Sequence, residues 1–167
     1  FTGATAIDVM PEEAKDLEKY LPFKGNIDID KTQQLIEKYG KENIAAIIIT
    51  VTNNSSGGQP VSMANVKALR DICNKYKLLL VIDGCRIAEN SYFIKHREIE
   101  YINRSYYEIA QEMLALGDAF IMSAKKDGLV NIGGLLTLKN EELSIKCKNQ
   151  LIISEGFTTY GGLAGRD

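Results

Sequence analysis

The fold is decided by the stretch IAAIIITVT at residues 44–52 together with the run LLLVID at residues 78–83. Both runs are apolar and rich in β-branched residues, and the first is so continuous that it predicts a strand buried on both faces. Between them, Ser62 is a helix N-cap, and Val66 and Leu69 fall on one face of the helix that follows. Strand, helix and strand in this order predict a βαβ unit with two parallel strands.

The same alternation continues on both sides of this unit. Strands are expected at residues 5–9, 119–122 and 135–138, and helices from an N-cap at Asp30 to Gly40, from the capping box of Ser105 and Glu108 to Leu116, and at 141–152. Apolar runs that alternate with helical patterns are typical of the α/β class. We therefore predict a mostly parallel sheet with helices on both faces.

Composition limits the possible functions. The chain has 167 residues, of which 45% are hydrophobic, which is enough for one domain with its own core. Its net charge of −2 gives no electrostatic footprint for nucleic acid or an anionic membrane. No apolar run reaches the roughly 18 residues of a membrane span, and no signal peptide is visible, so we expect no membrane association and a cytoplasmic location.

Histidine and cysteine usage excludes several kinds of catalytic and metal site. The single histidine, His96, stands in the charged sequence Lys95-His96-Arg97, where a solvent-facing side chain is expected rather than the oriented base of a Ser-His-Asp or Cys-His triad. The three cysteines are odd in number and show no C-x-x-C spacing. This argues against a disulfide framework and against a zinc site.

Asp83 and Lys126 are the candidate pair for binding a cofactor. Each is expected just past the end of a strand, where ligands bind in parallel sheets. A lysine can form a Schiff base with pyridoxal phosphate, and a buried carboxylate can keep the pyridine nitrogen of that cofactor protonated. Two simpler interpretations are left open, namely that Asp83 caps a turn and that Lys125-Lys126 is a solvated pair.

Four long segments resemble one enzyme family in both order and spacing. They are TNNSSGGQPVSMAN at 52–65, RIAENSYFIK at 86–95, the stretch 123–134 and the stretch 155–163. All four are similar to the tryptophanase and tyrosine phenol-lyase family, whose members are pyridoxal-phosphate lyases that cleave the side chain from aromatic amino acids. The resemblance implies the large domain of a fold-type I pyridoxal-phosphate enzyme, which is aspartate aminotransferase-like.

The resemblance also implies roles for the residues around the cofactor ring. Asp83 would pair with the pyridine nitrogen, while Asn54 and Arg86 would contact the phenolic oxygen. Lys126 would carry the covalent link, because the family motif places it on the second lysine, although position alone does not separate Lys126 from Lys125. Lys126, Asp83 and Arg86 are thus the implied catalytic residues.

Further positions are implied at the edge of this site. Ser123 would help to hold the phosphate, although a serine at a strand end is also a common turn former, and Arg86 has Glu89 as an alternative local partner. Lys125 would lie beside the cofactor. The backbone carbonyl of Asn131 matches a contact to a potassium ion. The dipeptide Gly84-Cys85 departs from the family pattern.

The implied reaction is β-elimination of tryptophan or tyrosine to pyruvate and ammonia, with indole or phenol as the other product. Local similarity is divided between the two substrates and leans towards tryptophanase. The resemblance implies that residues 1–167 are part of the large domain, without the N-terminal segment and the C-terminal small domain. The full-length protein would be a homotetramer. We expect the isolated chain to be inactive. The rival interpretations are another fold-type I enzyme, such as an aminotransferase or aldolase, and a non-catalytic module that assembles with a partner.

Overall fold

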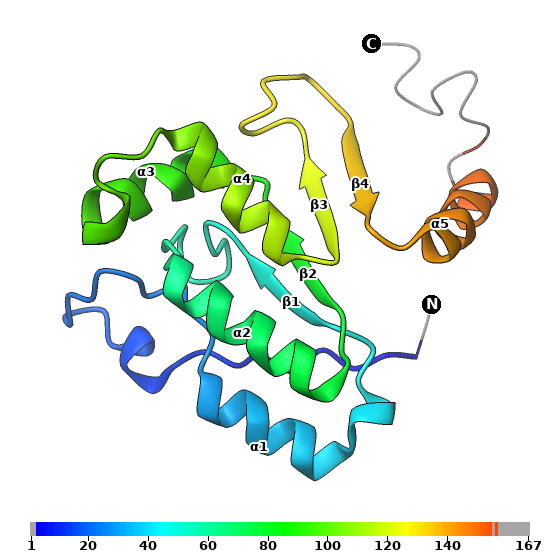
Figure 1. Cartoon of the computed structure of the whole chain (residues 1–167), viewed down its shortest axis with the longest axis horizontal. Helices are drawn as coiled ribbons and strands as arrows, with labels where there is room; N and C mark the ends of the chain where they lie inside the picture. The colour runs from blue at the N-terminus through cyan, green and yellow to red at the C-terminus, as the bar shows by residue number, and fades with distance from the viewer. Residues whose placement is uncertain (1–2, 155, 157–167) are drawn as a thin grey trace.

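The computed structural model describes residues 3–154 and 156, and it contains one four-stranded sheet (Figure 1). The strands lie in the order β1, β2, β3, β4, and their bounds are Ile47–Thr50, Leu80–Asp83, Ala119–Ser123 and Gly134–Leu138. The β1–β2 and β2–β3 pairs are parallel, whereas β4 runs antiparallel to β3. The prediction of a mostly parallel α/β sheet is confirmed.

Within the residues that the structure describes, five α-helices accompany the sheet. They are α1 (Ile29–Tyr39), α2 (Met63–Tyr76), α3 (Ile87–Arg97), α4 (Tyr106–Leu116) and α5 (Glu141–Ser154), with 3₁₀ turns at Glu12–Lys15, Lys41–Asn43 and Ile99–Tyr101. The predicted N-cap Ser62 and the capping box of Ser105 and Glu108 are confirmed. The N-cap of α1 is Asp28 rather than Asp30, because it is the Asp28 carboxylate that accepts from the Lys31 amide, at 2.9 Å.

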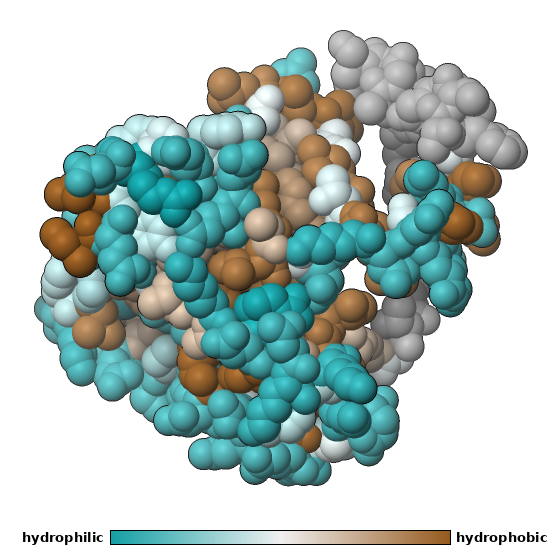
Figure 2. All heavy atoms as spheres, viewed as in Figure 1, coloured by the Kyte–Doolittle hydropathy of each residue, from teal (hydrophilic) through white to brown (hydrophobic). Residues whose placement is uncertain are grey.

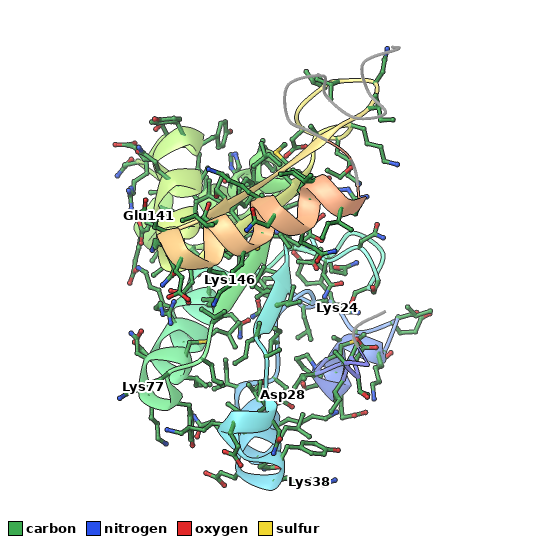
Figure 3. The ribbon with its side chains drawn as sticks, turned by 90° about the vertical axis from the view of Figure 1, so that its right-hand side faces the viewer. Lys24, Asp28, Lys38, Lys77, Glu141 and Lys146 are labelled. Atoms are coloured by element: carbon green, nitrogen blue, oxygen red, sulfur yellow. The ribbon has the colours of Figure 1, made fainter. Side chains whose placement is uncertain are left out.

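The core lies between the sheet and helices α1–α4. Ile49 of β1 and Ile82 of β2 are buried there with Leu69, Ile94 and Met113 of the helical layer. Figure 3 shows α2, which ends near Lys77, to one side of the strands, and α5, which carries Glu141 and Lys146, nearest the viewer.

The opposite face of β1 is open, which corrects one expectation from the sequence. Residues 44–52 were predicted to be buried on both faces, but the strand covers only 47–50, and the Ile48 side chain is 58% exposed. The prediction rested on the continuous apolar run, which is typical of strands with both faces in the protein interior. Within the described residues nothing covers Ile48 fully, although its neighbour in register, Val81, is buried.

Residues 5–9 form no strand, so that prediction was wrong. The segment has no regular secondary structure. Its Val9 carbonyl accepts a hydrogen bond from the Asp28 amide at 2.9 Å, which joins it to the start of α1. Ile7 is largely exposed, so the apolar pattern here did not mark a buried position. No helix within residues 3–154 is long and apolar enough to span a membrane.

Candidate functional site

Three loops meet at the carboxyl edge of the parallel strands. Asp83 is the last residue of β2 and Ser123 is the last residue of β3, and the loop that begins at Asn53 follows β1. Because β1, β2 and β3 run in the same direction, their carboxyl ends lie at one edge of the sheet. The structure thus brings together residues that the sequence separates by up to seventy positions.

The glycine-rich loop between β1 and α2 is closed by its own backbone. The Asn53 amide donates to the Gln59 carbonyl at 2.7 Å, and Gly57 and Gly58 have φ angles of +79° and +77°, a region that glycine adopts without strain. This closed turn presents Asn54 on its surface.

Arg86 contacts this loop. Its Nη2 donates to Oδ1 of Asn54 at 3.1 Å, so these two predicted residues lie together. The alternative local ion pair between Arg86 and Glu89 is not found among the described residues; Glu89 instead accepts from the Thr52 hydroxyl at 3.5 Å.

The Asp83 carboxylate is held on one side only. Its Oδ1 accepts from the Cys85 thiol at 2.9 Å, and the Cys85 Sγ in turn accepts from the Ser123 amide at 3.1 Å. Over the described part of the chain, Oδ2 of Asp83 has no hydrogen-bond partner. The carboxylate therefore has a fixed orientation and one oxygen left for a ligand.

A second set of contacts docks the lysine loop against the turn after β2. The Asp127 amide donates to the Cys85 carbonyl at 3.3 Å, and Oδ2 of Asp127 accepts from the Ala88 amide at 2.7 Å. Asp127, rather than Asp83, therefore caps the first turn of α3, and the alternative capping role of Asp83 is not observed. Within this loop Lys126 is half-buried, whereas Lys125 is exposed.

The remaining predicted positions are less enclosed. Ser123 is half-buried, and its backbone amide donates to the Cys85 sulfur. Asn131 is exposed in the connection between β3 and β4. Of the similar stretch 155–163, all residues except Gly156 lie outside the described residues.

Three positioning residues were not found by sequence reasoning, namely Cys85, Asp127 and Asn90. Asn90 is fully buried in α3, where its Oδ1 accepts from the Val61 amide at 2.9 Å and its Nδ2 donates to the Val61 carbonyl at 3.0 Å. These two bonds fix α3 against the end of the glycine-rich loop. Asn90 is spaced three residues after Ile87 and four before Ile94, and a polar residue on such an apolar helix face was the available signal for Asn90.

Gly84 has a steric explanation. A Cβ atom at this position would lie 2.3 Å from a ring atom of Phe120, which packs against the core. The departure from the family pattern at residue 84 is therefore matched by a large side chain on the neighbouring strand.

An ion pair fixes the opposite end of the same strands. Asp118, just before β3, accepts from the Leu80 amide at 2.8 Å and from Arg70 of α2 at 2.7 Å. Burial raises the pKa of the Asp118 carboxyl, but the bonds from Leu80 and Arg70 outweigh that effect and lower it. The start of β3 is thereby tied both to β2 and to the helical layer.

The chain matches known proteins over nearly its whole length. The family model described as beta-eliminating lyase matches residues 1–165. A tryptophanase from Salinibacter ruber is 49% identical over 166 residues, and a tyrosine phenol-lyase from Intrasporangium calvum is 50% identical over 165 residues. Each alignment covers 99% of this chain and 35% of the relative, so the chain spans about a third of the length of these relatives.

Solved structures show the same fold at low sequence identity. An omega-transaminase from Sphaerobacter thermophilus has a TM-score of 0.50 and 24% identity, over 71% of this chain and 23% of its own. An amine transaminase from an uncultivated Pseudomonas species, solved in a PLP-bound form, has a TM-score of 0.50 and 17% identity, over 72% and 24% of the two chains. These likenesses agree with the predicted aspartate aminotransferase-like fold. Since the family model spans residues 1–165, the chain belongs to the beta-eliminating lyase family.

Proposed function

We propose that the protein to which these residues belong is a pyridoxal-phosphate-dependent carbon–carbon lyase. It cleaves the side chain of tryptophan or tyrosine by β-elimination, consumes water, and releases pyruvate and ammonia with indole or phenol. Membership of the family and the names of two relatives support this proposal. The observation that carries it is the Asp83 carboxylate, held at the end of β2 with one free oxygen and joined through Cys85 to the docked loop of Lys126.

The residues at the sheet edge fit pyridoxal phosphate. The free oxygen of Asp83 offers an acceptor for a protonated ring nitrogen, Arg86 and Asn54 form a joined pair of polar groups on a neighbouring loop, and a half-buried lysine follows the next strand. Bound pyridoxal phosphate supplies an aromatic ring that withdraws electrons from the substrate carbon. Asp83 holds the proton on the ring nitrogen, because a carboxylate at this point favours the charged form of the base.

Lys126 has two tasks in this proposal. Its amine would hold the cofactor through its aldehyde, and as a free amine it would serve as the base for the proton on the substrate Cα. Its partial burial, compared with the exposure of Lys125, favours Lys126 for both tasks. Arg86, oriented by Asn54, stabilises negative charge on the phenolic oxygen, and Ser123 and Lys125 lie where the phosphate end is expected.

The proposal extends to properties of the full-length protein. The described chain is the central part of its large domain, with the remaining cofactor and substrate contacts on other segments. The protein is a cytoplasmic homotetramer, and a potassium ion bound by the Asn131 carbonyl adjusts the site. Tryptophan is the favoured substrate.

Two measurements on the full-length protein test this function. Addition of pyridoxal phosphate should produce a visible absorbance band that is removed by borohydride, and incubation with tryptophan or tyrosine should produce equal amounts of pyruvate and of indole or phenol. Keto-acid formation with transfer of the amino group to an acceptor would identify an aminotransferase. A protein that binds no cofactor would be a non-catalytic module, and either result would overturn the proposal.

A further inference from the structure

The Cys85 thiol occupies an unusual place, because it connects the two halves of the candidate site. It is 9% exposed, it donates to Asp83 Oδ1 at 2.9 Å, and it accepts from the Ser123 amide at 3.1 Å. The first contact stays within the turn after β2, while the second crosses to the end of β3. The thiol thus serves both as a donor, to Asp83, and as an acceptor, from Ser123.

We propose that Cys85 is a positioning residue for the Asp83 carboxylate, which it orients so that Oδ2 faces the cofactor. This inference rests on the proposed function, since it assigns Asp83 to the ring nitrogen. A carboxylate that accepts at one oxygen from a fixed donor loses rotational freedom about its terminal bond, and its other oxygen is then pre-oriented for a ligand. The bond from the Ser123 amide to the same sulfur atom restrains the donor in this orientation.

Two other cysteines provide the contrast. Cys73 is fully buried in the apolar core on α2, where burial raises the pKa of its thiol to about 11. No hydrogen bond of its side chain is recorded among the described residues, so it fills space. Cys147 lies on α5, outside the core. Cys85 is therefore distinguished by its two polar contacts and not by burial alone.

The first test needs no cofactor and no activity. In the cofactor-free full-length protein, a hydrogen bond to a carboxylate should shift the infrared S–H stretching band of Cys85 to lower frequency, and the band is assigned by its loss in Cys85→Ser. Asp83→Asn should move this band to higher frequency, because an amide oxygen is a weaker acceptor than a carboxylate. A Cys85 band that is unchanged in Asp83→Asn would overturn the inference.

The second test measures the consequence for cofactor binding. Cys85→Ala should weaken the equilibrium affinity for pyridoxal phosphate by about tenfold, the size expected for losing one hydrogen bond to a charged group. Cys85→Ser, which retains a donor and an acceptor, should recover most of that loss, and Cys73→Ala should leave the affinity unchanged. Equal affinities for Cys85→Ala and the wild type would contradict the positioning role even if the proposed function holds.

The two proposals fail in different ways. If the wild-type protein bound no pyridoxal phosphate, the proposed function would fall, yet the infrared comparison would still decide whether Cys85 orients Asp83. If binding were normal and only the Cys85→Ala result were negative, the function would stand without this residue. Should Cys85→Ala fail to fold, the infrared comparison of the wild type, Cys85→Ser and Asp83→Asn carries the test.

Discussion

The two halves of the candidate site lie in regions that differ sharply in packing. Asp83 and Cys85 belong to the region of β1, β2 and helices α2–α4, where Ile82, Ile94 and Met113 are fully buried. Lys126 belongs to the β3–β4 connection, where Leu129 is 90% exposed, and Figure 2 shows apolar side chains gathered on the surface over this hairpin. The carboxylate therefore has a rigid support, whereas the lysine depends on a few contacts with that support.

The first prediction concerns the rigid half. Asp83→Asn in the full-length protein should retain the covalently bound cofactor but lower turnover by about 10³-fold, because a neutral amide does not keep the ring nitrogen protonated. Absorbance spectra and initial rates measure the two properties separately. Asp71→Asn, on the exposed surface of α2, is the matched control and should be neutral. Near-normal turnover in Asp83→Asn would show that this carboxylate is structural.

The second prediction tests how the rigid half is held together. Asn90→Leu preserves most of the side-chain volume but leaves the amide and the carbonyl of Val61 without their partner, which should destabilise this contact by about 3 kcal/mol. Hydrogen exchange of peptides that contain Val61, followed by mass spectrometry, should show faster exchange. Asn149→Leu, at an exposed position of α5, should not change it. Unaltered protection at Val61 would mean that loop and helix are joined by packing alone.

The third prediction concerns the link between the two regions. Asp127→Ala removes the acceptor of the Ala88 amide, and loss of such a helix cap costs about 1 kcal/mol. We expect faster exchange at Ala88 and weaker binding of pyridoxal phosphate, since the Lys126 loop is no longer docked. Asp127→Asn retains an acceptor oxygen and should restore much of both. The account of the lysine loop would be wrong if Asp127→Ala changed neither property.

The fourth prediction addresses acid sensitivity of the helical layer. Burial raises the pKa of Glu112, but hydrogen bonds from Lys67, Tyr101 and Arg104 outweigh it and lower the pKa from 4.5 to about 2. A lowered pKa means that the ionised carboxylate stabilises the fold above pH 4.5, and that this contribution is lost as the pH falls from 4.5 towards 2. Because Lys67 and Arg104 are partly exposed, we expect about 1 kcal/mol at neutral pH.

The comparison that checks this is Glu112→Gln against the wild type. Glu112→Gln should be less stable in denaturant at neutral pH, and the difference should shrink in acid as the wild-type carboxylate becomes protonated. Glu142→Gln removes the negative charge from the exposed ion pair between Glu142 and Lys146 on α5. It is the control and should show little difference in stability at any pH. A difference that stayed constant with pH would mean that the charge of Glu112 is not involved.

Much of the fold was predictable from local signals. The run at 78–83, the N-cap Ser62 and the capping box at Ser105 each act within a few residues, and each was confirmed. Helix α3 was not predicted, because its N-cap residue Arg86 provides no side-chain cap and the acceptor comes from Asp127, 39 residues after Ala88. The open face of β1 was missed because an apolar run does not reveal what covers it.

For the candidate site, the sequence predicted the residues expected at the cofactor but not the residues that support them. Spacing and resemblance predicted Asp83, Asn54, Arg86 and Lys126 as site residues, and Arg86 and Asn54 lie in contact in the structure. Cys85 contacts Asp83 within one turn, but the bonds that anchor Cys85 to Ser123 and Asp127 to Ala88 join segments almost forty residues apart, which no local pattern reveals. Position alone does not separate Lys125 from Lys126; the family motif favours Lys126, and the half-buried position of Lys126 beside an exposed Lys125 supports the same choice.

The central claim is that Lys126, in the less packed region, carries the cofactor beside Asp83 of the packed region. The most direct measurement is borohydride reduction of the full-length protein loaded with pyridoxal phosphate, followed by proteolysis and mass spectrometry of the labelled peptide. We predict a single cofactor-modified lysine at residue 126, with none at Lys125, and loss of the label in Lys126→Ala but not in Lys125→Ala. A label on Lys125, or on neither lysine, would contradict the account.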